Sequence, residues 1–259
     1  MNTDEYANRL FIIFTGPAGS GKSTLTASFG RWLEEAFNYK VTYVNLDPGC
    51  EYLPYKPDFD IRSMFTCRDI MIREKIGPNA AMIRASELML EKIDEIINQI
   101  ARVSGEIVVV DTPGQMEVFI FHESGPEVIK RLSQMGRVIS VFILDAKFAR
   151  RAADLVVARL MGLSATLRLE IPTIIVLNKS DICSRSDIDK LLIDVDYLSE
   201  VLMKEGDGVI SDMAAMLTDA ISSMSGAIRI VKVSALKMIG FPELYDLIHE
   251  AFCTCGDLT

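Results

Sequence analysis

The chain has 259 residues, of which 49% are hydrophobic and 24% charged. This length and composition are typical of a soluble globular protein that can bury a large core in one domain, so a disordered chain is excluded. The formal net charge of −9 provides no general positive field for nucleic acid. We therefore expect no direct binding of nucleic acid, and an anionic ligand must be held by local groups.

The N-terminal residues and the cysteines bear on where in the cell the protein is expected. The first eight residues are polar and acidic, and the apolar run Leu10–Phe14 is too short to cross a membrane. The five cysteines show no zinc-ligand spacing, so reduced thiols in the cytoplasm are expected. Two of them, Cys253 and Cys255, either sit at a helix end or form a metal-binding or redox pair.

Short apolar runs alternate with segments of helical period along the chain. The expected strands are Leu10–Thr15, Val41–Leu46, Ile107–Val110, Val138–Leu144, Thr173–Leu177 and Ile228–Val233. The expected helices are Ser23–Phe37, Ala80–Arg102, Glu123–Gln134, Phe148–Leu167 and Phe241–Phe252. The alternation predicts an α/β fold of three layers, with a mostly parallel central sheet covered by helices on both faces.

Two segments elaborate this single domain of residues 1–259. Residues 48–105 separate the second and third strands and contain a long helix, which predicts a parallel, right-handed crossover rather than a hairpin. Residues 185–227 form a helical insertion, expected as Asp187–Lys204 and Val209–Met224. Its methionines either fill a core or form an adaptable apolar surface for a partner; they are Met203, Met213, Met216 and Met224.

The stretch Gly16–Ser23 matches the phosphate-binding pattern G-x(4)-G-K-[ST] between an expected strand and an expected helix. Glycines let backbone N–H groups turn toward phosphate oxygens, and the helix N-terminus adds its positive end. Lys22 is expected to reach the β- and γ-phosphates and the Ser23 hydroxyl to bind Mg²⁺. The expected phosphate-binding residues are Gly16, Ala18, Gly19, Ser20, Gly21, Lys22, Ser23 and Thr24.

Acidic and amide side chains follow the next two strands of the expected sheet. Asp111 ends the third strand, where it is expected to hold Mg²⁺, and Gly114 allows close approach to the γ-phosphate. Gln115 either orients the attacking water or faces solvent. Asp47 either caps the turn before Pro48 or faces the metal and the water, and we favour the second. The sequence shows no specific candidate for an arginine finger from the same chain. Arg62 and Arg68 are not excluded from this role.

The sequence Asn178-Lys179-Ser180-Asp181 follows the expected fifth strand and is expected to select guanine. A carboxylate at Asp181 accepts from guanine N1–H and the 2-amino group, whereas adenine would leave it unpaired. Asn178 is expected to bridge base and phosphate loop, with the Lys179 stem against the ring. The backbone of Ser234 and Ala235 is expected to donate to guanine O6.

With these motifs placed, the chain resembles the GPN-loop GTPases, most closely the archaeal type, which belongs to the all-parallel branch of P-loop GTPases. The resemblance covers nearly the whole chain. It rests on Gly16–Thr24, Val44–Asp47, Leu53–Tyr55, Gly77–Asn79, Asp111–Glu117, Asp196–Leu198 and Cys253–Thr259. An alternative for Gly77-Pro78-Asn79 alone is a helix start with Asn79 as N-cap.

The resemblance implies a homodimer in which each Gly-Pro-Asn loop reaches the nucleotide site of the partner. Gly77, Pro78 and Asn79 would then contact the γ-phosphate region in trans, and Lys22, Asp47 and Gln115 would complete the catalytic set. The expected metal ligands are Ser23, Asp47 and Asp111. The only cofactor expected is Mg²⁺, with GTP as substrate.

The expected function is hydrolysis of GTP to GDP and phosphate in a switch cycle. Through the resemblance, the protein is an assembly factor for a larger complex such as RNA polymerase. An alternative is a GTP-dependent scaffold or chaperone that binds a client and hydrolyses GTP incidentally. A phosphotransferase is a third and weaker alternative.

Overall fold

The computed structural model describes residues 9–183, 185–206, 208–222 and 230–252. Most of the expected elements fall within these ranges. Cys253, Cys255, Met224 and the first two residues of the expected strand Ile228–Val233 lie outside the described residues.

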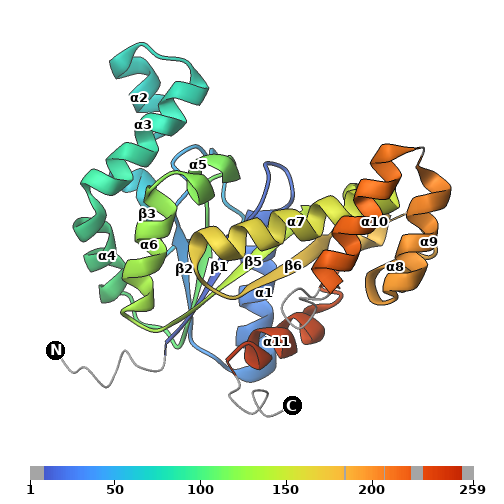
Figure 1. Cartoon of the computed structure of the whole chain (residues 1–259). Coiled ribbons are helices and arrows are strands. Elements are labelled where there is room, and N and C mark those ends of the chain that lie inside the picture. Colours follow the sequence, from blue (N-terminus) through green and yellow to red (C-terminus); the bar gives the residue numbers. More distant parts are fainter. Residues whose placement is uncertain (1–8, 184, 207, 223–229, 253–259) are drawn as a thin grey trace.

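A seven-stranded sheet forms the centre of the molecule (Figure 1). Its strands are β1 (Leu10–Thr15), β2 (Val41–Asn45), β3 (Phe59–Asp60), β4 (Ile107–Asp111), β5 (Arg137–Asp145), β6 (Thr173–Asn178) and β7 (Ile230–Lys232). They lie in the order β3-β2-β4-β1-β5-β6-β7, and every paired strand is parallel to its neighbour. The expected crossover between Val41–Leu46 and Ile107–Val110 is confirmed, because β2 and β4 pair in parallel.

Helices cover both faces of this sheet, as expected for three layers. They are α1 (Lys22–Phe37), α2 (Cys67–Glu74), α3 (Pro78–Glu91), α4 (Ile93–Arg102), α5 (Met116–Phe121), α6 (Ser124–Ser133), α7 (Ala152–Leu169), α8 (Ile188–Ile193), α9 (Val195–Glu205), α10 (Val209–Ser222) and α11 (Phe241–Glu250). Side chains of β1 alternate between two cores because successive residues of a strand face opposite sides. Phe11 and Ile13 enter the core under α3, α4, α6 and α7, whereas Ile12 and Phe14 enter the core under α1 and α11.

Two expected long helices are broken. The helix expected over Ala80–Arg102 is α3 followed by α4, since Lys92 leaves helical geometry (φ −107°, ψ 17°). This break allows α4 to bury Ile96 and Ile100 in the core. The helix expected over Asp187–Lys204 is α8 followed by α9, because the Asp194 carboxylate caps the new helix by accepting from the Tyr197 N–H at 2.9 Å.

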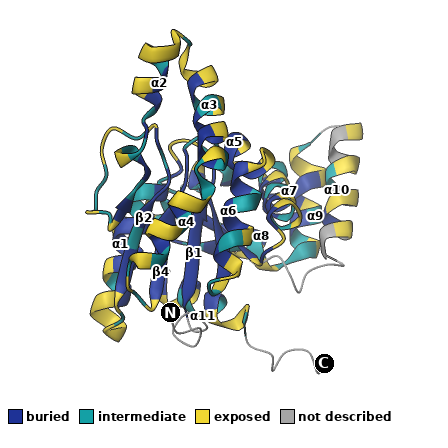
Figure 2. Ribbon diagram, turned by 90° about the vertical axis from the view of Figure 1, so that its left-hand side faces the viewer, coloured by how far each residue is buried: buried dark blue, intermediate teal, exposed yellow. Residues whose placement is uncertain are grey.

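The segment between β2 and β4 extends beyond the carboxyl ends of the strands. Helix α2 and the start of α3 pack on each other and stand clear of the sheet, with much of their surface exposed (Figures 1 and 2). Strand β3 and helix α2 were not expected, and neither was α5. These elements have two, eight and six residues, so they show too little periodicity to be identified from the sequence.

The interpretation of the insertion methionines as core residues is wrong for three of them. Met203, Met213 and Met216 are exposed, and Met216 exposes 73% of its surface. They lie at the end of α9 and on α10, which pack on each other and on α7. In the part of the chain that the structure describes, no helix is long and apolar enough to cross a membrane.

Candidate nucleotide-binding site

The turn between β1 and α1 is shaped by glycines. Gly16, Gly19 and Gly21 have φ values of 137°, 74° and 96°, a region that side chains rarely adopt. A Cβ at Gly16 would lie 2.2 Å from the Ile143 carbonyl oxygen, so the turn passes close to β5. Gly21 precedes α1 and contributes no side chain to its N-terminus. The arrangement leaves the positive end of α1 open toward the turn, as an anion site requires.

Lys22 folds back over this turn. Its Nζ donates to the carbonyl oxygens of Gly16 at 2.8 Å and Pro17 at 3.0 Å. Burial lowers the pKa of Lys22, while the carboxylates of Asp111 and Asp47 act in the opposite direction. A buried cation is costly unless it is paired, so Lys22 is suited to bind an anion such as a phosphate group.

The two acidic residues of the expected metal site meet beside Lys22. Asp111 is fully buried at the end of β4. Burial raises the pKa of Asp111 to about 6, and the nearby Asp47 adds to this effect. The Asp111 Oδ2 accepts from the Tyr55 hydroxyl at 3.2 Å. Among the described residues, its Oδ1 is buried without a hydrogen-bond partner.

Asp47 caps the turn at Pro48, which is the first of the two alternatives considered for it. Its Oδ1 caps the turn by accepting from the Gly49 N–H at 2.8 Å, and its Oδ2 accepts from the Gly114 N–H at 3.2 Å. Burial also raises the pKa of Asp47, against hydrogen bonds and Lys22 that lower it. Asp47 therefore links the end of β2 to the loop that follows β4.

The donor set fits a magnesium ion. Mg²⁺ is usually held by one or two carboxylates together with a hydroxyl, waters and the phosphates of the substrate. Ser23, Asp47 and Asp111 supply such oxygens, and the unpartnered Oδ1 of Asp111 needs a positive partner. Within the described ranges no group of three His, Cys, Asp or Glu side chains gathers, so an all-protein metal cage is not present there.

The Gly-Pro-Asn sequence forms the start of α3. Gly77 is the residue before the helix and Pro78 its first residue, so the alternative that Asn79 is the N-cap is wrong. Asn79 is exposed, and its Oδ1 accepts from the Gln115 Nε2 of the same chain at 3.1 Å. The structure thus brings together two expected catalytic side chains that are far apart in the sequence.

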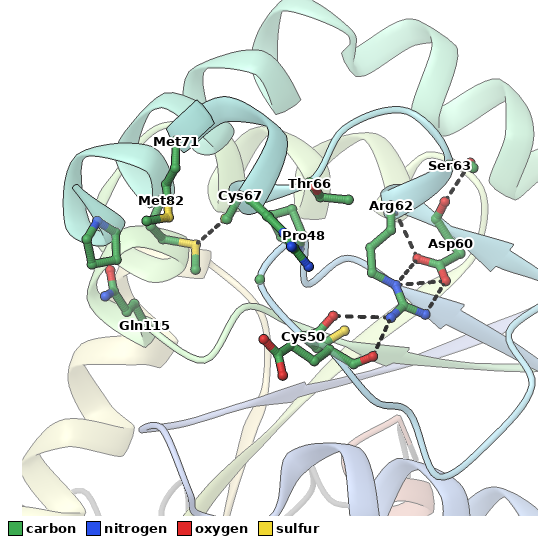
Figure 3. A pocket seen from close by; sticks show the side chains of 14 residues that line it. Pro48, Cys50, Asp60, Arg62, Ser63, Thr66, Cys67, Met71, Met82 and Gln115 are labelled. Carbon is green, nitrogen blue, oxygen red and sulfur yellow. Dashed lines mark hydrogen bonds and ion pairs between the residues drawn. The ribbon is translucent and has the colours of Figure 1, made fainter. Parts of the chain in front are cut away.

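A cleft of about 1080 Å³ opens beside Gln115. Gln115 and Arg62 lie at opposite ends of it, with Pro48 and Cys67 between them (Figure 3). The Arg62 guanidinium is committed to the Asp60 carboxylate at 2.7 Å and to the Cys50 carbonyl oxygen at 3.1 Å. It would have to release these partners to act as an arginine finger.

The residues expected to select guanine gather beside the phosphate loop. The Asn178 Nδ2 donates to the Ser20 carbonyl oxygen at 2.9 Å, which confirms the expected bridge to the loop. Lys179 adopts a left-handed conformation (φ 64°), and its Nζ donates to the Gly19 carbonyl oxygen at 2.7 Å. The exposed Asp181 accepts from the Ser234 hydroxyl at 2.6 Å, which lowers the pKa of Asp181.

The backbone of Ser234 and Ala235 differs from the expectation. The Ser234 N–H donates to the Ile239 carbonyl oxygen at 3.0 Å, and the Ala235 N–H donates to the Asn178 Oδ1 at 3.1 Å. Both donors expected for guanine O6 therefore have internal partners. The Ser234 hydroxyl has a role that was not expected, because it orients the base-selecting carboxylate.

Sequence reasoning missed Asp145, which ends β5 and pairs with Lys179 at 2.7 Å. Burial acts to raise the pKa of Asp145, but the hydrogen bond from Lys179 outweighs it and the pKa lies below its ordinary value. The signal was available, because Asp145 directly follows an expected strand at the edge where ligands collect. Asp145 is not part of any short sequence motif, so a search for motifs does not identify it.

Comparison with known proteins agrees with this geometry. A family described as "Conserved hypothetical ATP binding protein" matches residues 14–254. The chain is 40% identical over 255 residues to GPN-loop GTPase PAB0955 of Pyrococcus abyssi, covering 96% of this chain and 100% of that protein. It is 35% identical over 196 residues to GPN-loop GTPase 3 of Dictyostelium discoideum, covering 73% of this chain and 68% of that one.

Among solved structures, the chain is similar to the crystal structure of the same Pyrococcus abyssi protein, a GTPase in apo form. The TM-score is 0.86 at 37% sequence identity, and the match covers 96% of this chain and 100% of the other.

Proposed function

This chain belongs to the GPN-loop GTPase family, and from that premise we propose that it binds GTP with Mg²⁺ and hydrolyses it to GDP and phosphate. The observation that carries the proposal is the joining of two sites by Asn178, whose side chain contacts both the phosphate loop and Ala235. A base held at Asp181 and a triphosphate held at Gly16–Ser23 would then occupy one continuous site.

Different residues bind the phosphates, hold the metal ion and orient the attacking water. Loop N–H groups and Lys22 bind the β- and γ-phosphates, and Lys22 exchanges the carbonyls of Gly16 and Pro17 for phosphate oxygens. Mg²⁺, held by Ser23, Asp47 and Asp111, supplies positive charge to the phosphate oxygens when it is bound. Gln115 orients the water that attacks the γ-phosphorus, and the bond from this phosphorus to the bridging oxygen of GDP breaks.

Base choice separates GTP from the ATP named in the family description. Asp181 is a charged acceptor that its Ser234 partner holds in place. Guanine presents N1–H and the 2-amino group to such an acceptor, whereas adenine has an acceptor at N1 and no amino group at C2. We therefore expect calorimetry with Mg²⁺ to show binding of GTP and GDP. Equal affinity for ATP, or no binding of any nucleotide, would contradict the proposed function.

The active unit is a homodimer in which Gly77, Pro78 and Asn79 of one chain serve the site of the other. The exposure of Asn79 at the start of α3 supports this arrangement, because the side chain is accessible to a partner. In the single chain Asn79 already contacts Gln115. Association would then exchange a contact within one chain for the equivalent contact between chains.

The protein acts in the cytoplasm as a switch or assembly factor for a larger complex such as RNA polymerase. A scaffold that binds a client in a GTP-dependent manner is the second candidate, and the exposed Met203, Met213 and Met216 favour it. Retention of subunits from native extract on the GTP-loaded protein tests the first candidate. Client affinity that differs between GTP and GDP without any effect on turnover would favour the second.

A further inference from the structure

The side chain of Tyr55, in the segment between β2 and β3, reaches the buried Asp111. Its hydroxyl donates to the Asp111 Oδ2 at 3.2 Å. The other oxygen of this carboxylate, Oδ1, is buried and has no hydrogen-bond partner in the described part of the chain. The bond from Tyr55 therefore fixes which oxygen of Asp111 remains available for a cation.

The position of Tyr55 is set independently of Asp111. Its ring stacks on the ring of Tyr43 in β2, with centroids 5.5 Å apart and planes inclined by 29°. Asp58 fastens the same loop to that strand, because its carboxylate accepts from the Tyr43 N–H and its own N–H donates to the Tyr43 carbonyl oxygen, each at 2.8 Å. The hydroxyl of Tyr55 is thus held in place before any ligand arrives.

We propose that Tyr55 is a positioning residue for the magnesium site, which orients the Asp111 carboxylate through its hydroxyl. Carboxylates that bind metals are themselves held by hydrogen bonds, and loss of such a partner typically weakens metal binding by about 10- to 100-fold. The inference rests on the proposed Mg²⁺-GTP function. It adds that the loop preceding the Gly-Pro-Asn segment is connected to the metal carboxylate.

The test is a Mg²⁺ titration of GDP binding by calorimetry, from excess EDTA to millimolar metal, with the wild type and Tyr55→Phe. The variant keeps the ring and its stacking on Tyr43 and loses only the hydroxyl. We expect the Mg²⁺ concentration that gives half of the full effect on GDP binding to rise by about tenfold. This is the lower end of the range given above for loss of a hydrogen-bond partner of a metal-binding carboxylate. The affinity for GDP in EDTA should stay unchanged, since the hydroxyl of Tyr55 bonds to Asp111 and its ring stacks on Tyr43, neither of which belongs to the phosphate loop or the guanine motif.

Tyr43→Phe is the matched control. It removes a hydroxyl from the other ring of the same stack, but that hydroxyl donates to Glu34 at 3.2 Å, away from Asp111. Its Mg²⁺ midpoint should equal that of the wild type. An equal rise in both variants would overturn the inference, because the effect would then come from the stack rather than from the hydroxyl.

Failure of the positioning role and failure of the proposed function give different results in this titration. A Tyr55→Phe midpoint equal to that of a wild type that responds normally to Mg²⁺ would overturn the positioning role alone. Reduced affinity in EDTA by the same factor as in Mg²⁺ would also overturn it, because the defect would then be structural. A wild type that binds no guanine nucleotide would overturn both the inference and the proposed function.

Discussion

At the scale of single residues, the proposed choice of base depends on Asp181. Its carboxylate is exposed, receives the Ser234 hydroxyl at 2.6 Å and lies next to the strand end that holds Asn178. Replacement by an amide turns one of the two acceptor atoms into a donor. The amide nitrogen would then face a donor of guanine. Recognition should therefore move toward a base that presents an acceptor there.

We expect Asp181→Asn to lower the affinity for GTP by about 100-fold or more and to make xanthosine triphosphate the better ligand. Competition between the two nucleotides, measured by calorimetry, reports the change. Asp189→Asn is the control, since Asp189 lines the same pocket as Asp181 but its carboxylate pairs with Lys232. Unchanged preference for GTP in Asp181→Asn would mean that another group selects the base.

At the scale of elements, a small polar network fastens the extended segment to the sheet edge. Asp60 at the end of β3 accepts from Arg62 at 2.7 Å and from the Asn45 amide in β2 at 2.9 Å. Burial acts to raise the pKa of Asp60, but these hydrogen bonds outweigh it and hold the pKa below its ordinary value. The charged form of Asp60 therefore stabilises the folded state.

The sign of the pH dependence follows from that lowered pKa. The stabilisation is fully present above the pKa of an unfolded aspartate, near 3.9, and is lost as the pH falls through the lower pKa of the folded state. Asp60→Asn should lower the free energy of unfolding by about 1–3 kcal/mol at pH 7, and the difference from wild type should shrink below about pH 4. Urea unfolding across this range measures both quantities.

The matched control is Glu87→Gln, which removes an exposed carboxylate paired with Arg84 at 3.0 Å. Little change is expected at any pH, because exposed ion pairs contribute little to stability. A difference between Asp60→Asn and wild type that stays constant down to pH 3 would contradict the assigned role of the charge.

At the scale of the whole molecule, the question is whether Asn79 serves its own chain or the partner. The contact between Asn79 and Gln115 at 3.1 Å lies within one chain, whereas the proposed dimer places the loop in the opposite site. Asn79→Ala and Gln115→Ala should each slow GTP hydrolysis and leave GTP affinity nearly intact. Their effects when mixed differ between the two arrangements.

If the loop acts in trans, a mixed dimer contains one complete site, formed by Gln115 of one chain and Asn79 of the other. An equimolar mixture that assorts randomly should then recover about a quarter of wild-type turnover, measured as phosphate release. No recovery, in a mixture shown by mass to contain mixed dimers, would instead assign function to the contact within the chain.

Much of the fold and site is predictable because it depends on contiguous residues. The alternation of apolar runs predicts the parallel sheet, and the residues Gly16–Ser23 and Asn178–Asp181 each lie in one short stretch at the end of a strand. Elements of a few residues, such as β3 and α5, are not predictable in this way. Their stability comes from contacts with the rest of the chain rather than from local periodicity.

By itself the sequence determined the phosphate loop, the Asn178–Asp181 motif and the order of most strands and helices, since backbone conformation and hydrophobic pattern are local properties. Only the tertiary structure decided that Tyr55 holds Asp111, that Asp145 pairs with Lys179, that Asn79 contacts Gln115, and that three methionines of the insertion face outward. The physical reason is that these contacts join residues brought close by the packing of separate elements. The separation of these residues along the chain does not indicate that they lie close together in space.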